Sequence, residues 1–197
     1  MRCPSCRALL NAPLPQCAQC GLSLADLDRK FGIVPLYSRY LTDRTERLSL
    51  RDAQQLRQAL CLFQRKFPQL LFSVMLVDLH PPAPISEYAF WLINRARFSE
   101  FQATGARNLE LLLVIDPSAK EAALVTGYGL ENYLTEEDLT EALDAARPGL
   151  EAGDLANAIA NCIDFMARRL REIAMHIEAG QAETGGEAVQ EPATETP

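Results

Sequence analysis

The sequence lacks a long apolar run. Nowhere in its 197 residues does it reach the roughly 18 consecutive apolar positions that a membrane helix requires. The first residues also lack the apolar core of a signal peptide. These absences argue against a membrane-spanning protein and against a membrane partner, and we expect the protein to be cytoplasmic.

Histidine is scarce, and the common catalytic motifs are missing. The chain has only His80 and His176, and it contains no G-x-S-x-G, P-loop, G-x-G-x-x-G or H-E-x-x-H motif. Asp78 and His80 lie at the carboxyl end of one apolar run and Asp116 ends another, so they would form an acid-base cluster if the two runs were neighbouring parallel strands. A solvated His80 beside a stiff proline-rich connection is the alternative, and the one that the sequence favours.

Charge is unevenly distributed along the chain. The net charge is -7, yet residues 1–98 carry 13 Lys and Arg against 7 Asp and Glu, whereas residues 99–197 carry 6 against 19. Such asymmetry can indicate an acidic partner for the first half. The arginines are scattered, however, without interleaved aromatic residues or a known nucleic-acid module, so the pattern does not favour nucleic-acid binding.

Cysteine has the most informative spacing. Four of the six cysteines form two C-x-x-C pairs separated by ten residues: Cys3, Cys6, Cys17 and Cys20. In a reducing compartment, thiols at this spacing are metal ligands rather than disulfides. Each C-x-x-C turn can place two sulfurs about 2.3 Å from one tetrahedral Zn²⁺. The sequence therefore predicts a zinc ribbon.

The predicted four-cysteine site has no open coordination position. Because protein sulfurs fill the tetrahedron, the metal would hold together a segment too short to bury a core of its own. The ribbon then serves as a scaffold or as a docking surface for a protein partner. A redox dithiol pair and an iron centre in the same cage are alternatives that spacing alone does not separate.

The apolar pattern of the remaining chain predicts an α/β domain. Helices are expected over 49–67 and 86–97, from Thr135 to a break at Pro148, and from Asp154 to about residue 178. Strands are expected over 71–79, 109–116 and 121–126. The β-α-β order makes the first two strands parallel, and a short turn returns the third strand antiparallel. The first strand is a nearly continuous apolar run, which indicates helices on both faces of a small mixed sheet.

Composition divides the chain into four parts. The zinc ribbon occupies 1–24, a linker 25–36, the α/β domain 37–178 and an acidic tail 179–197. The tail has almost no large apolar residue, so burial cannot offset the entropy cost of ordering it. We expect the tail to be disordered.

Several short segments of the α/β domain match a known pattern. They are Tyr40-Leu41-Thr42-Asp43, Leu48-Ser49, Glu87-Tyr88-Ala89, Leu111 to Val114, Gly127-Tyr128-Gly129-Leu130-Glu131 and Gly153-Asp154. With the order of the elements, they resemble the TPM domain family over roughly residues 37–176. The resemblance implies a three-layer α/β/α sandwich, acid phosphatase activity and binding of a divalent metal ion.

One position departs from that family's pattern. In the family an Asp-Asn-Gly segment precedes the long apolar strand, and its aspartate is implicated in holding a cation near the G-Y-G-L-E loop. The matching residues here are Arg107, Asn108 and Leu109. A guanidinium removes an oxygen ligand and places a positive charge where Ca²⁺ or Mg²⁺ would sit, which disfavours either ion.

We hypothesise that Arg107 replaces the cation by pairing with Glu131, with Asp43 nearby. The alternative is that the glycines of the G-Y-G-L-E loop only permit a tight bend and Glu131 is an exposed acid. The ligand-binding candidates implied by the resemblance are Arg107, Asn108, Tyr128, Glu131 and Asp43.

Two functions follow from these observations. The first is a noncatalytic binding or regulatory protein whose zinc ribbon docks a protein partner. The second is a divergent TPM-type acid phosphatase, in which Glu131, Asp43 and Asp116 surround a cation or Arg107 grips the phosphate directly. Enzyme activity rests on family resemblance alone, so the sequence favours the first function.

Overall fold

The structure is a computed structural model that describes residues 2–10, 16–96 and 106–184. Its sheet has four strands in the order β1 (Leu41–Asp43), β2 (Leu71–Leu76), β3 (Glu110–Asp116) and β4 (Glu121–Thr126). The first three strands are parallel, and β4 runs antiparallel to β3. Every residue of β2 and β3 is buried, which is why their sequences are mostly apolar.

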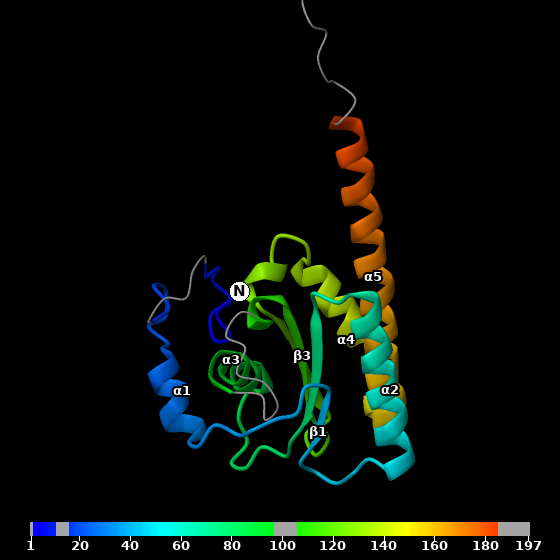
Figure 1. The fold of residues 1–197 in the computed structure, drawn as a ribbon. Helices are drawn as coiled ribbons and strands as arrows, with labels where there is room; N and C mark the ends of the chain where they lie inside the picture. The colour runs from blue at the N-terminus through cyan, green and yellow to red at the C-terminus, as the bar shows by residue number, and fades with distance from the viewer. Residues whose placement is uncertain (1, 11–15, 97–105, 185–197) are drawn as a thin grey trace, which may run out of the picture.

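Helices cover both faces of the sheet (Figure 1). One face packs against α2 (Leu50–Lys66), α4 (Glu136–Ala152) and α5 (Leu155–Thr184), and the other against α1 (Leu24–Phe31), α3 (Ile85–Arg95) and the cysteine-rich segment. Side chains alternate along β3 accordingly, with Leu111 and Leu113 in the first core and Leu112 and Val114 in the second. The predicted α/β/α sandwich is confirmed.

Helix starts follow the capping signals in the sequence. The Ser49 side chain accepts a hydrogen bond from the Asp52 amide at the start of α2, and Thr135 and Asp138 form a capping box at the start of α4. Asp138 is buried and also pairs with Arg169 of α5. The cap therefore fixes the start of α4 against α5, and with it one side of the site described below.

Two helices continue past the ends that the sequence predicts. The expected break at Pro148 is wrong, because α4 runs on to Ala152 and ends at Gly153, whose φ of 76° lies in the left-handed region. Gly149 and Leu150 are buried, and a Cβ on Gly149 would lie 2.6 Å from the Ala158 amide nitrogen of α5. This close packing holds the turn around Pro148 in place. Similarly, α5 reaches Thr184 rather than about residue 178.

The stretch 25–36, expected as a linker, begins with helix α1 instead. Ser23 and Asp26 form a capping box at its start, and Leu27 is buried. Asp28 accepts hydrogen bonds from Trp91 Nε1 and Arg95 of α3. A helix of eight residues is too short to show a repeated apolar stripe, so its tertiary contacts decide its formation.

No helix of the described residues is long and apolar enough to cross a membrane. The end of the predicted acidic tail, 185–197, lies outside the described residues.

Candidate functional site

The four cysteines lie on two turns with the same backbone pattern. In the first turn the Cys3 amide donates to the Ala8 carbonyl, and the Cys3 carbonyl accepts from the Arg7 amide. In the second, Cys17 makes the same two bonds with Leu22 and Gly21. Arg7 and Gly21 occupy equivalent positions with φ of 62° and 76°, a conformation that glycine adopts readily and arginine rarely. Each turn is thus a tight loop that aims its two sulfurs inward.

The sulfurs form one compact cluster. All four Sγ atoms of Cys3, Cys6, Cys17 and Cys20 lie within 4.8 Å of one another, and the Cys3–Cys20 and Cys6–Cys17 pairs are each 3.6 Å apart. A disulfide would require about 2.05 Å, whereas a tetrahedron with metal–sulfur bonds of about 2.3 Å has edges of about 3.8 Å. The cluster therefore has the size and donor set of a metal site.

The surroundings of the thiols differ between the two turns. The amides of Cys20 and Gln19 lower the pKa of the Cys17 thiol to about 6, while burial raises the pKa of Cys3 to about 12. Amide groups that stabilise a thiolate also suit a metal-bound sulfur, because both carry negative charge. Cys3 and Cys17 are buried and Cys20 is exposed, so the site lies at the surface with its inner half covered.

The segment that carries the two cysteine turns, residues 2–10 and 16–23, is called the cysteine module below. It is attached to the α/β domain by apolar packing and by ion pairs. Cys3, Leu10 and Cys17 belong to the core cluster that includes α3. Arg2 Nε lies 2.8 Å from Glu136 Oε2, and an Arg7 guanidinium nitrogen lies 3.1 Å from Glu136 Oε1. Glu136 is in the first turn of α4. One carboxylate therefore joins both arginines of the first cysteine turn to the domain.

Replacing Glu136 with glutamine should weaken this attachment only slightly. All three side chains are about half exposed or more, and exposed ion pairs contribute about 0.2–1 kcal/mol each. We expect the free energy of unfolding, measured in urea at low salt, to fall by about 1 kcal/mol and the difference to shrink at high salt. Glu137→Gln is the control, since Glu137 is in the same helical turn but lacks such a pair among the described residues. Equal losses in both variants would contradict the role of Glu136.

The predicted ligand loop is only partly assembled. The 3-10 helix η2 (Tyr128–Leu130) lies against the 3-10 helix η1 (Ala106–Leu109), so closely that a Cβ on Gly129 would lie 2.8 Å from the Asn108 carbonyl oxygen. The loop that carries Tyr128 and Glu131 thus lies beside Asn108 at the start of β3. Burial raises the pKa of Tyr128. The Arg107 side chain lies outside the described residues, so its pairing with Glu131 stays a prediction.

The structure does not bring Asp43 to Glu131. Asp43 pairs in register with Leu76, which pairs with Ile115 near the carboxyl end of β3. Glu131 lies in the loop that begins at Gly127. The Gly127 amide donates to the carbonyl of Glu110, which is at the opposite, amino end of β3. Strand β3 has seven residues, a length of about 20 Å. The expectation of Asp43 near Glu131 is therefore wrong, because β1 and the η2 loop lie at opposite edges of the sheet.

Carboxylates at the carboxyl edge of the sheet stabilise loops. Asp43 accepts bonds from the Thr45, Glu46 and Leu48 amides, and although burial opposes it, this bonding lowers the pKa of Asp43. Asp116 is buried and accepts from the amides of Leu79, Ser118 and Ala119. These amides bind both oxygens of each carboxylate, which suits a structural role better than acid-base chemistry.

Of the other polar residues at this edge, Asp78 bonds to the Ser118 hydroxyl and to Arg47. His80 is exposed, which agrees with the solvated position that the sequence favoured for it.

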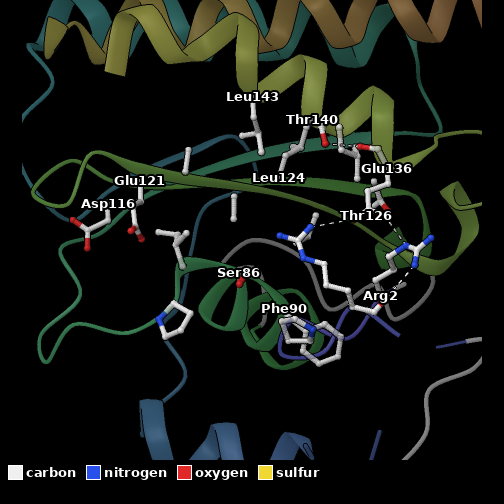
Figure 2. Close-up of a pocket in the computed structure, with 18 of the residues that line it drawn as sticks. Arg2, Ser86, Phe90, Asp116, Glu121, Leu124, Thr126, Glu136, Thr140 and Leu143 are labelled. Carbon is white, nitrogen blue, oxygen red and sulfur yellow. Dashed lines mark hydrogen bonds and ion pairs between the residues drawn. The ribbon is translucent and has the colours of Figure 1, made fainter. Parts of the chain in front are cut away.

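A large groove runs along β4 (Figure 2). Its cavity volume is about 1340 Å³, and it is lined by all of β4, by α3 and α4, and by residues of the first cysteine turn. Asp116 and Glu121 lie at one end, and Arg2 and Glu136 at the other. The groove thus extends from the cysteine module along the full length of β4.

The TPM domain family model matches residues 41–169. The chain belongs to the TPM domain family. The matched region starts at β1 and ends within α5, so the cysteine module and α1 precede the TPM domain.

Solved structures share the fold of this TPM domain at low sequence identity. The N-terminal domain of a protein from P. gingivalis has a TM-score of 0.52 and 20% identity, covering 69% of this chain and 92% of its own. The N-terminal domain of the cg2496 protein from Corynebacterium glutamicum has a TM-score of 0.52 and 16% identity, with 70% and 83% covered. The BA42 protein from Bizionia argentinensis has a TM-score of 0.55 and 11% identity, with 66% and 86% covered. A search of curated proteins found no similar sequence.

Sequence reasoning missed the groove and one buried acid. Glu110, at the start of β3, is fully buried and accepts a hydrogen bond from the Tyr37 hydroxyl. An acidic residue directly before the apolar run 111–115 was a signal that could have identified it. The groove had no such signal, because its walls come from segments far apart in the sequence.

Proposed function

We propose that this TPM-domain protein is a noncatalytic binding or regulatory module, and that its cysteine module is a structural zinc ribbon bordering a protein-binding groove. The observation that carries the proposal is the position of the groove. It runs from the cysteine module along the edge strand of the sheet, while the carboxylates Asp43 and Asp116 are occupied by loop amides.

Zinc is the ion that the donor set favours. Four sulfurs in a tetrahedral cluster suit Zn²⁺, which has no preferred geometry of its own and is common in closed structural sites. Iron in the same thiolate cage is the alternative. A reducing compartment such as the cytoplasm would keep the thiols available for either ion. Elemental analysis of the purified protein distinguishes the two.

A phosphatase would require the catalytic groups to converge. The candidates were Glu131, Asp43 and Asp116, and Asp43 and Glu131 lie at opposite edges of the sheet. Both oxygens of Asp43 and Asp116 already accept backbone hydrogen bonds. Proton transfer by either group would first have to break this bonding.

We therefore expect no hydrolysis of p-nitrophenyl phosphate above the buffer blank. The assay runs from acidic to alkaline pH, with and without Mg²⁺ or Ca²⁺, and the enzyme-free rate sets the baseline. Glu131→Ala and Arg107→Ala are assayed in parallel. Turnover in the unaltered protein that either substitution abolishes would overturn the noncatalytic proposal and support the phosphatase.

A further inference from the structure

Strand β4 is an edge strand, and one of its sides pairs with no other strand of the part of the chain that the structure describes. The Gly127 amide donates to the Glu110 carbonyl, and residues of an antiparallel pair alternate in the direction of their backbone groups. It follows that Glu121, Ala123 and Val125 bond to β3. The amides and carbonyls of Ala122, Leu124 and Thr126 face the other way, toward the groove. Within the described residues, no hydrogen bond joins these outward groups to another segment.

The free edge is recessed between two helices. Figure 2 shows β4 with α4 on one side, carrying Thr140 and Leu143, and α3 on the other, carrying Ser86 and Phe90. Leu139 of α4 and Ile85 of α3 extend these walls. Leu9 of the cysteine module also lines the groove and is 60% exposed. The groove thus offers unpaired backbone groups at its base and apolar side chains on both walls.

We propose that the groove binds one extended segment of a partner protein, which adds to the sheet as a fifth strand beside β4. The inference rests on the proposed binding function and names the class of partner. Three outward-facing residues present an amide and a carbonyl each, enough to pair with a strand of about five residues. Because both walls are apolar, the bound segment should carry apolar or β-branched residues on both faces.

The recess favours a single strand over a second copy of this chain. In a second copy β4 would lie equally deep between its own α3 and α4, so the helices would meet before the two edges came within the roughly 4.8 Å of paired strands. The chain's own residues 185–197 also fit poorly, since they contain no Lys or Arg that could pair with Glu121 at one end of the groove.

A basic residue is expected at one end of the bound segment. Glu121 is exposed at the start of β4, and no ion pair to it occurs among the described residues. The neighbouring Lys120 ammonium instead donates to the Glu151 carbonyl. At the other end, Arg2 is paired with Glu136. The Glu121 end therefore attracts a Lys or Arg of the partner.

The test uses a fluorescently labelled peptide, Lys-Lys-Val-Ala-Val-Thr-Val, titrated with the intact protein. Two derivatives carry N-methyl groups on alternate amides, one on the odd and one on the even positions. A bound strand directs only one set of amides to β4, so one derivative should bind at least about tenfold more weakly and the other within about threefold of the parent. Equal binding of both derivatives, or no binding of the parent, overturns the proposal.

Hydrogen exchange of the unaltered protein gives a residue-by-residue readout. In the free protein the amides of Ala122, Leu124 and Thr126 should exchange faster than those of Ala123 and Val125, which β3 protects. Saturating peptide should slow the first group and leave the second unchanged. If exchange slows only in the cysteine module, the binding site is elsewhere and the proposal is wrong.

Two substitutions on α4 locate the bound peptide. Thr140→Trp fills the groove, whereas Glu141→Trp places the same side chain on an exposed position outside it. We expect the first to weaken peptide binding at least about tenfold and the second to leave it unchanged.

Glu121→Lys should weaken binding of the same peptide about two- to fivefold. A peptide that carries glutamates in place of the two lysines should instead bind the Glu121→Lys variant more tightly than the unaltered protein. If these binding results are not obtained and the protein also shows no phosphatase turnover, strand addition alone is refuted. Phosphatase turnover would refute the proposed binding function itself.

Discussion

Replacement of Cys17 by serine should abolish metal binding and unfold the cysteine module. Cys17 is buried and contributes one of the four clustered sulfurs, and a neutral hydroxyl is a far weaker ligand than a thiolate. Structural zinc sites contribute about 10–16 kcal/mol of apparent binding free energy, which is also folding free energy. We expect the metal content to fall from about one ion per chain to near zero. The amides of Arg7 and Gly21 should lose their protection from hydrogen exchange.

The TPM domain should survive this loss with reduced stability. The core formed by the sheet with α2, α4 and α5 contains none of the described residues of the cysteine module, whereas the core around α3 includes Cys3, Leu10 and Cys17. Thermal unfolding should remain cooperative at a lower midpoint.

Cys61→Ser is the matched control, because Cys61 is a half-buried cysteine of α2 outside the cluster. Metal retained by Cys17→Ser, or a metal-free protein with full exchange protection in the module, would contradict a structural role.

Truncation of Trp91 to alanine should cost about 3–5 kcal/mol of unfolding free energy. Trp91 is completely buried in α3. Its ring lies 5.3 Å from that of Phe31 and 5.6 Å from that of Tyr88, and its Nε1 donates to Asp28 at 2.9 Å. The residue therefore fills the space between α1 and α3 and also joins them by a hydrogen bond. Its loss leaves a cavity that rigid neighbours cannot fill.

Trp91→Phe separates the two contributions. Phenylalanine keeps most of the apolar contact but lacks the Nε1 donor, while Asp28 retains its bonds to Arg95. We expect a smaller loss of about 1–2 kcal/mol, the scale of one hydrogen bond and a small packing defect. Urea unfolding is followed by far-UV circular dichroism rather than by tryptophan fluorescence, because both substitutions remove the sole tryptophan. Similar losses in the alanine and phenylalanine variants would show that the hydrogen bond, rather than packing, dominates the stabilisation by Trp91.

Much of the fold was predictable because its signals are local. The Ser49 and Thr135 caps marked the starts of α2 and α4 within a single turn. The mostly apolar sequences of β2 and β3 marked strands buried on both faces. The turn between β3 and β4 is short, so the antiparallel return and the meeting of Gly129 with Asn108 followed from it.

The errors share one cause, which is reliance on local signals where packing decides. Pro148 ordinarily ends a helix, yet the contact of Gly149 with α5 keeps α4 continuous. Helix α1 is too short for its pattern to stand out, and Trp91 and Arg95 of α3 hold it in place. In both cases residues distant in sequence supply the deciding free energy.

The sequence by itself determined the four-cysteine cluster, helices α2 to α5, and strands β2, β3 and β4 with their parallel and antiparallel directions, because ligand spacing and side-chain period act over a few residues. Only the tertiary structure decided that Asp43 and Glu131 lie apart and that β4 is an edge strand beside a groove. The position of a strand in a sheet depends on long-range pairing, and the shape of a groove on which helices cover each face. No local pattern of residues encodes either of them.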